Sequence, residues 1–239
     1  MRKGFTLAEV LITLAIIGVV AAMTIPTLIS NYQKKEYVAR LQKAHSVLVN
    51  GFKLMLATEG VDTIIQSNFA NELETSGDNS VTGESLVQSI QNNLTKYFKI
   101  ADACYGISEN ACSFYSTEYR ELNGAEVGKL LGATYFSLTD GTVYVLMPFK
   151  HSHSFASYMY IDVNGAVGPN TFGRDMFAYY LVDKGTHFDL MAMGPESMYN
   201  QTFEDDPTMC GVPGSTDISM ANGQGCAERI IKEGWKMNY

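Results

Sequence analysis

The feature that most constrains this 239-residue chain is an uncharged segment of 20 residues, 10–29, near its N-terminus. As an α-helix rising about 1.5 Å per residue, the segment would be about 30 Å long, which matches the hydrocarbon core of a bilayer. Arg2 and Lys3 precede the segment, so the positive-inside rule predicts a cytoplasmic N-terminus and a translocated remainder. The sequence therefore predicts a single membrane-spanning helix at its start.

Two ordinary explanations of this segment are a secretory signal peptide and a plain signal anchor. A signal peptide ends in a cleavage site of small residues after a shorter apolar region. Ala21 and Ala22 are small, but the apolar run continues past them and leads into an amphipathic stretch. Glu9 does not fit a plain anchor, because a carboxylate at the start of a spanning helix is costly and usually marks function.

Charge is distributed unevenly along the chain. Residues 30–58 contain five basic side chains and one acidic side chain, a charge of +4, whereas residues 59–239 contain 23 acidic and 10 basic side chains, a charge of −13. The whole chain has a formal charge of −8, which argues against a nucleic-acid-binding surface spread over the molecule. Since 46% of the residues are hydrophobic and 18% are charged, wholesale disorder is excluded.

The string from Lys3 to Leu11, KGFTLAEVL, closely resembles the cleavage and methylation motif of type IV prepilins and type II secretion pseudopilins. In that family, a membrane peptidase removes a basic leader after a glycine and methylates the new N-terminal amine. The resemblance implies cleavage between Gly4 and Phe5. It also implies four regions: a leader (1–4), a transmembrane and polymerisation helix (5–29), an amphipathic stem helix (30–58) and a periplasmic or extracellular globular head (59–239).

The same resemblance gives two residues of the helix a role in assembly. Glu9 of an incoming subunit would pair with the Phe5 amine of a neighbour in the fibre, and pairing of Glu9 with its own amine is the alternative. Pro26 lies 21 residues after Phe5, where many pilins carry a proline. Two roles of this proline stay open: partial unwinding from Gly18 to Pro26 in the filament, and a simple kink at the membrane exit.

Periodicity predicts an α+β fold in which the long N-terminal helix packs on an antiparallel sheet, as in pilins. The stem has one apolar stripe: Val38, Leu41, Leu48, Phe52 and Met55. A second helix is predicted over 84–100, within a region 60–130 that we interpret as an insertion with its own cysteine pair. Five strands are predicted, over 135–138, 143–147, 157–163, 176–182 and 187–193, with a hairpin turn at Asp140 and Gly141.

The four cysteines all lie on the translocated side of the predicted anchor, where disulfides are favoured. They allow three pairings, and we favour Cys104 with Cys112 and Cys210 with Cys226 because each pair closes a compact loop. A C-terminal loop closed by a disulfide is also common in type IV pilins. The spacings match no zinc motif, and reduced structural thiols are the alternative.

Residues 162–175 (DVNGAVGPNTFGRD) resemble a loop of many pilin-like heads. Side-chain oxygens between glycine turns suit Ca²⁺, which takes about six to eight oxygen ligands. The candidate ligands are Asp162, Asn164, Asn170 and Asp175. The structural alternative is a turn braced by Asn and Asp hydrogen bonds. His151 and His153 share a face if extended, but would need a third ligand to hold a metal.

The sequence thus predicts a structural pilin or pseudopilin subunit and no enzyme, since no nucleophile motif such as G-x-S-x-G is recognisable. The implied partners are the prepilin peptidase/N-methylase, other pilins and an inner-membrane assembly platform. The basic residues Lys34, Lys35, Arg40 and Lys43 would contact anionic lipids, the next subunit's acidic head or solvent. The main alternative is a different class of protein: a signal-anchored periplasmic binding domain, with or without calcium dependence, that never polymerises.

Overall fold

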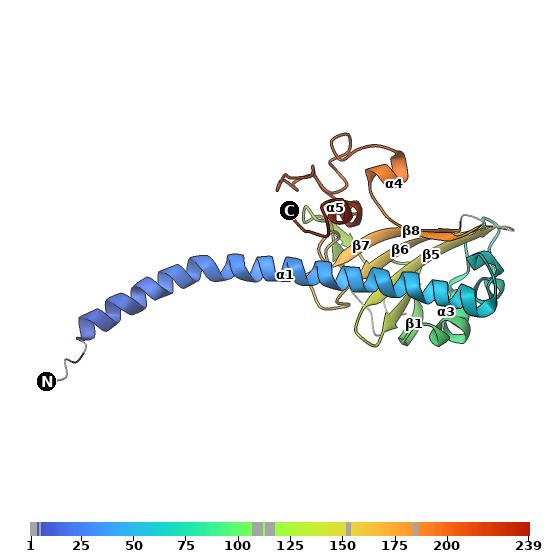
Figure 1. The fold of residues 1–239 in the computed structure, drawn as a ribbon, viewed down its shortest axis with the longest axis horizontal. Helices are drawn as coiled ribbons and strands as arrows, with labels where there is room; N and C mark the ends of the chain where they lie inside the picture. Colours follow the sequence, from blue (N-terminus) through green and yellow to red (C-terminus); the bar gives the residue numbers. More distant parts are fainter. Residues whose placement is uncertain (1–3, 5, 107–111, 113–117, 152–153, 184–185) are drawn as a thin grey trace. The chain divides into compact units, whose positions relative to one another are not determined.

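The computed structural model describes residues 4, 6–106, 112, 118–151, 154–183 and 186–239. The chain forms two compact units, Met1–Glu36 and Tyr37–Tyr239. The described α-helices are α1 (Leu7–Glu59), α2 (Asn68–Asn71), α3 (Gly83–Asn93), α4 (Pro195–Tyr199) and α5 (Cys226–Lys232). The described strands (Figure 1) are β1 (Ile100–Gly106), β2 (Tyr119–Arg120), β3 (Glu126–Gly128), β4 (Ala133–Leu138), β5 (Val143–His151), β6 (Ser154–Asp162), β7 (Met176–Asp183) and β8 (Phe188–Ala192).

Helix α1 unites the two helical segments that the sequence predicts. It contains Pro26, and the helix continues across this residue. Gly60 follows the helix with a φ of 68°, the left-handed conformation with which glycine commonly ends a helix. The predicted apolar stripe is buried in the second unit: Val38, Leu41, Leu48, Phe52 and Met55.

The helix predicted over 84–100 ends earlier than expected. Helix α3 stops at Asn93, and one 3₁₀ turn, Leu94–Lys96, follows it. Asparagine has a low helix propensity, and two of them end α3, so the last turn tightens and the Tyr97 N–H donates to the Leu94 carbonyl over 2.9 Å. Phe98 is nevertheless buried, because the 3₁₀ turn still directs it to the core.

Six of the described strands form one antiparallel sheet in the order β1-β4-β5-β6-β7-β8. The five predicted strands correspond to β4 to β8, so the predicted antiparallel sheet and α+β class are confirmed. The region 60–130, which we interpret as an insertion, contributes β1 to an edge of this sheet, and this strand was not predicted. Its sequence, IADACYG, mixes small and polar residues and its burial does not alternate cleanly, which explains why periodicity missed it.

The hairpin between β4 and β5 turns at Asp140 and Gly141, as predicted. Gly141 has a φ of 88°, which a residue with a side chain rarely adopts. The Leu138 N–H donates to the Thr142 carbonyl over 2.8 Å, and the Thr142 N–H donates to Asp140 Oδ1 over 3.1 Å. This turn sets the register in which β4 and β5 present alternate side chains to the core.

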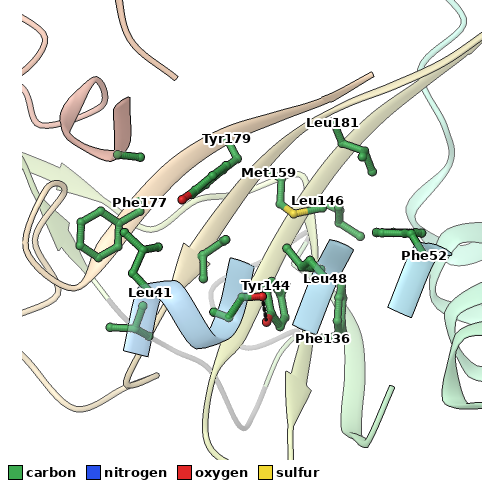
Figure 2. Close-up of a cluster of buried hydrophobic side chains, with 14 of the residues drawn as sticks. Leu41, Leu48, Phe52, Phe136, Tyr144, Leu146, Met159, Phe177, Tyr179 and Leu181 are labelled. Carbon is green, nitrogen blue, oxygen red and sulfur yellow. Dashed lines mark hydrogen bonds between the residues drawn. The ribbon is translucent and has the colours of Figure 1, made fainter. Parts of the chain in front are cut away.

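The core lies between the second part of α1, residues 37–59, and one face of the sheet. Figure 2 shows Leu41, Leu48 and Phe52 of α1 facing the strands. The sheet contributes buried side chains from β4 to β7: Phe136, Tyr144, Leu146, Met159, Phe177, Tyr179 and Leu181. The Tyr144 hydroxyl donates to the Ala44 carbonyl of α1 over 3.2 Å, which satisfies the one polar group of this buried ring.

The C-terminal tail completes this core. Helix α5 places Ile230 in it, and Trp235 packs half-buried against it. A second, smaller apolar cluster contains Tyr135, Val145 and Phe172. The head therefore has its own apolar core, and the stem helix packs along one side of it.

Candidate assembly helix and the loop of residues 162–175

The first turn of α1 is closed by a reciprocal set of hydrogen bonds between Thr6 and Glu9. The Thr6 N–H and the Thr6 hydroxyl each donate to Glu9 Oε2 over 2.8 Å. The Glu9 N–H donates to Thr6 Oγ1 over 3.3 Å. This arrangement is a capping box, in which a threonine before the first helical residue and a glutamate three positions later satisfy each other's backbone donors.

The sequence motif predicts that Glu9 pairs with an amine, either of a neighbouring subunit or its own, whereas its partner Thr6 was not predicted. The T-x-x-E spacing of a capping box was the signal that could have identified it. Gly4 lies outside the helix and is exposed, whereas Phe5 falls outside the described residues. The two predicted amine partners of Glu9 therefore stay predictions.

The part of α1 that follows the capping box is apolar on all sides and exposed. Leu11, Ile17 and Met23 have exposed fractions of 58%, 63% and 73%. By length and composition, α1 is the one helix among the described residues that could cross a membrane, and none of its most apolar window is buried. A surface of this kind is covered by lipid or by other apolar helices.

Two of the basic side chains of the stem are used within the head itself. Lys43 Nζ donates to Asp140 Oδ2 in the β4–β5 turn over 2.7 Å, with 61% and 31% of the two side chains exposed. Arg40 Nη1 donates to the Val163 carbonyl over 3.4 Å. Exposed ion pairs contribute little stability, so this pair chiefly orients the turn against the stem.

The loop of residues 162–175 starts from a buried carboxylate at the end of β6. Asp162 Oδ1 accepts from the Asn164 N–H over 3.2 Å and from the Gly165 N–H over 2.8 Å. Asp162 Oδ2 accepts from the Tyr119 hydroxyl over 2.8 Å. The carboxylate thus holds the first turn of the loop and fixes it to β2.

A second buried carboxylate holds the other end of the loop. Asp175 Oδ1 accepts from the Thr171 N–H over 2.7 Å, and Oδ2 accepts from the Asn170 N–H over 2.8 Å. Burial raises the pKa of Asp175, and the hydrogen bonds from these two backbone groups oppose that rise. Both aspartates that the sequence proposes as metal ligands therefore brace backbone turns.

The two asparagines of the predicted calcium site provide a different observation. The side-chain oxygens of Asn164 and Asn170 are buried and have no hydrogen-bond partner among the described residues. Free amide oxygens suit a hard cation such as Ca²⁺. Within the described part of the chain, however, no group of three or more His, Cys, Asp or Glu side chains is placed to hold a metal.

The loop also joins several distant segments of the head. The backbone of Arg120 in β2 hydrogen-bonds to it, and Arg40 of α1 reaches the carbonyl of Val163 at its start. The hydroxyl of Tyr239 donates to the Gly173 carbonyl over 2.7 Å. The loop is therefore a junction between the stem helix, β2 and the C-terminal tail.

The cysteines form two disulfides, Cys104–Cys112 and Cys210–Cys226. The first closes a span of 8 residues and the second a span of 16. The side chain of His151 and the whole of His153 lie outside the described residues, so their shared face stays a prediction.

Arg229 is fully buried in α5, and no role was predicted for it. Its Nη1 donates to the Cys210 carbonyl over 2.6 Å, its Nη2 to the Ser215 carbonyl over 2.9 Å and its Nε to Glu233 Oε1 over 2.9 Å. The guanidinium lies 4.8 Å from the centre of the Tyr239 ring. A lone arginine in a short helix gives no sequence signal of this role, in which Arg229 links the disulfide loop to the tail.

Comparisons with known proteins agree with the N-terminal motif. Residues 1–25 match the family described as the prokaryotic N-terminal methylation motif. A fimbrial protein of Neisseria meningitidis serogroup B (strain ATCC BAA-335 / MC58) is 30% identical over 100 residues, which cover 42% of this chain and 51% of that protein. The type IV major pilin protein PilE of Neisseria gonorrhoeae is 27% identical over 127 residues, 53% of this chain and 65% of the relative.

Further similarity is shorter. The type IV major fimbrial protein FimA of Dichelobacter nodosus is 43% identical over 58 residues, 24% of this chain and 32% of that protein. The chain thus spans about half to two thirds of the length of the first curated relatives that it matches. No solved structure matches the chain significantly.

Proposed function

We propose, from the methylation motif that makes this chain type IV pilin-like, that it is a structural subunit of a type IV pilus-like or type II secretion filament. The observation that carries the proposal is the position of the motif: it leads directly into an exposed helix that is uncharged over residues 10–29. The relatives are fimbrial and pilin proteins by name, which favours a structural role over a catalytic one.

The first part of α1, residues 7–36, carries many exposed apolar side chains. Apolar side chains exposed around a whole helix are unfavourable in water, and two environments remove them from it. One is the hydrocarbon of a membrane, and the other is a bundle of the same helices from other subunits. A filament subunit needs both environments in turn, since it resides in the membrane before it joins the fibre.

Processing after Gly4 would create the group that guides assembly. Cleavage leaves a positively charged amine on Phe5, and in apolar surroundings a carboxylate is compensated best by such a charge. Glu9 of an incoming subunit would pair with the Phe5 amine of a neighbour, which would set the axial register. Pro26 would supply the local freedom, a kink or a partial unwinding, that packing in the fibre needs.

The finer assignments of partners and location belong to the same proposal. A prepilin peptidase/N-methylase would process the chain, and an inner-membrane assembly platform and other pilins would receive it. Before assembly the chain would cross the bacterial inner membrane once, with Arg2 and Lys3 on the cytoplasmic side and the head in the periplasm. The oxidising periplasm suits the two disulfides of the head.

Intact mass and N-terminal sequencing test the proposal. The full chain would be expressed with a prepilin peptidase and recovered from membranes. We expect a chain that begins at N-methylated Phe5. A chain that still carries Met1 to Gly4 would contradict the proposal and would leave a signal-anchored periplasmic domain that does not polymerise.

Calcium binding by the loop of residues 162–175 is a second, separate proposal. The unpartnered oxygens of Asn164 and Asn170 support it, while the carboxylates of Asp162 and Asp175 would have to share their hydrogen-bonded oxygens with the ion. Calorimetry of the full chain in detergent, with and without millimolar Ca²⁺, is the test. Absence of both binding heat and a thermal shift would leave the loop a purely structural junction.

A further inference from the structure

One face of α1 changes from aliphatic to aromatic to basic where the uncharged segment ends. Ile25, Leu28, Tyr32 and Lys35 follow one another at spacings of three, four and three residues, which places them on the same side of the helix. All four side chains are exposed, and Tyr32 is 67% exposed. This face therefore presents two aliphatic side chains, then a tyrosine, then a lysine.

The order of these side chains matches the layers of a bilayer. If the uncharged segment 10–29 fills the hydrocarbon core, Tyr32 lies about 4–5 Å and Lys35 about 9 Å beyond its end, at about 1.5 Å per residue. The headgroup layer extends about 5–7 Å past the hydrocarbon on each side. Tyrosine is enriched at this depth, and the flexible stem of a lysine can place its ammonium group among the lipid phosphates.

Within the described part of the chain, Lys35 is the basic side chain near this layer that remains available for an outside partner. Arg40 and Lys43 donate to groups of the head. Lys34 is half-buried and has an interaction partner, as does the neighbouring acid Glu36. Lys35, in contrast, is exposed and takes part in no ion pair or hydrogen bond with the described residues.

Processing would increase the importance of this end of the segment. Cleavage after residue 4 would remove Arg2 and Lys3, the basic side chains on the cytoplasmic side. From residue 5 to residue 33 the mature chain then has one charged side chain, Glu9. Its first basic side chains therefore lie at the opposite, translocated end of the membrane-spanning segment.

We propose that Tyr32 and Lys35 form an interfacial anchor that binds the headgroups of anionic phospholipids in the translocated leaflet and holds the mature subunit at a fixed depth. Opposite charge favours Lys35 beside a lipid phosphate, and the continuous aliphatic face before it places both residues at that layer. The inference rests on the proposed function, which puts residues 10–29 in the membrane. Residues 59–239 carry a charge of −13, which disfavours a general attraction to anionic lipid, so the preference has to be local.

Lipid selectivity tests the role of Lys35. The full chain is inserted into bilayers that mix phosphatidylcholine with phosphatidylglycerol, and the lipids that it retains on extraction are quantified by mass spectrometry. We expect the wild type to retain phosphatidylglycerol preferentially. Lys35→Gln should lower the ratio of the anionic to the zwitterionic lipid about fivefold, which corresponds to the attraction of one basic residue near an anionic surface. High salt should lower the wild-type ratio as well.

Lys53→Gln is the matched control. Lys53 is an exposed lysine of the same helix, about 27 Å further along its axis, so its removal changes the net charge equally but lies far from the headgroups. The lipid ratio should not change. Loss of selectivity in Lys53→Gln equal to that in Lys35→Gln would overturn the inference, because the preference would then follow net charge.

A depth measurement tests the role of Tyr32. Tyr32→Trp is combined with Trp235→Phe, so that position 32 carries the one tryptophan of the sequence. Phosphatidylcholines brominated at different positions of the acyl chain then quench its fluorescence according to depth. We expect the strongest quenching from bromine nearest the headgroup. Strongest quenching by bromine deep in the acyl chain, or no quenching by any of these lipids, would overturn the anchor.

Two further outcomes would contradict the proposal. One is a wild-type chain that retains both lipids equally. The other is a Lys35→Gln variant that keeps its lipid preference but enters filaments poorly, which would assign Lys35 to a contact with another copy. Failure of the proposed function is distinguishable, since the chain recovered from cells would then keep residues 1–4 whatever lipid it retains, whereas failure of the inference leaves processing and filaments intact.

Discussion

The two parts of helix α1 have the same backbone conformation and opposite surroundings. In the first part, large apolar side chains such as Leu11 and Leu28 are 58% and 70% exposed. In the second part, Leu41, Leu48 and Met55 are fully buried against the sheet. The second part is thus satisfied within its own chain, whereas the first needs lipid or other subunits.

The second part of the helix therefore contributes to folding of the head, and the first part remains available for assembly. Changes in the second part should alter the stability of the head, and changes in the first part should alter what the chain joins. The capping box of Thr6 and Glu9 stands at the end that other subunits would contact. Variants placed in each part test this division.

The largest effect on assembly is expected from Glu9→Ala. It would leave the Phe5 amine of a neighbour without a partner in the apolar interior of a fibre, at a cost of about 3 kcal/mol. Since about 1.4 kcal/mol is tenfold, incorporation into sheared filaments should fall about a hundredfold. Cleavage after Gly4, followed by intact mass, should be unaffected.

A matched variant in the head is Glu84→Ala, because Glu84 is an exposed acidic side chain at the start of α3. It should assemble as the wild type does. Undiminished incorporation of Glu9→Ala would contradict the assembly mechanism, even if the methylation motif were processed normally.

In the second part of α1, Leu48→Ala should destabilise the head by about 2–5 kcal/mol, because it removes a fully buried side chain and leaves a cavity. The readout is urea unfolding of the full chain in detergent, followed by the fluorescence of Trp235, the single tryptophan of the sequence. Leu11→Ala is the control in the first part, and it should leave this transition unchanged. Equal effects of the two variants would disprove the division of the helix.

The two disulfides allow a comparison within the head. Replacing Cys210 and Cys226 by alanine opens a span of 16 residues and should cost about 3 kcal/mol. Replacing Cys104 and Cys112 opens a span of 8 and should cost about 0.6 kcal/mol less, because loop entropy changes slowly with length. Urea unfolding of both double variants measures the difference, and a larger effect of the shorter loop would contradict the entropic account.

Sequence patterns predicted those parts of the fold whose signal is local. The stem stripe from Val38 to Met55 and the turn at Asp140 and Gly141 depend on spacing or on one residue type, and both were predicted correctly. Strand β1 was missed because its place in the sheet comes from pairing with β4, which no local alternation in IADACYG records.

The candidate site divides in the same way. The roles of Gly4, Phe5 and Glu9 came from a contiguous motif, and Thr6 was overlooked although its spacing to Glu9 was visible in the sequence. The role of Asp162 depends on Tyr119, 43 residues earlier, and such a contact arises only from the tertiary fold. Composition suggested a metal at this loop, but it could not reveal that the carboxylate already accepts three hydrogen bonds.

The smallest expected effect concerns His45, on the buried part of α1. Its ring lies 5.6 Å from that of Tyr179 and 6.1 Å from that of Trp235, and its Nδ1 has no hydrogen-bond partner among the described residues. Burial lowers the pKa of His45 below its ordinary value of about 6.5. The unfolded chain therefore binds a proton at a higher pH than the folded chain does. The free energy of unfolding should accordingly fall as the pH drops below about 6.5, and level off once the folded state is protonated as well.

Urea unfolding between about pH 7.5 and pH 5 measures this slope, and His45→Gln should reduce it while Glu9→Ala should not. An unchanged slope in His45→Gln would assign the acid sensitivity of the head to other groups and remove this histidine from the comparison.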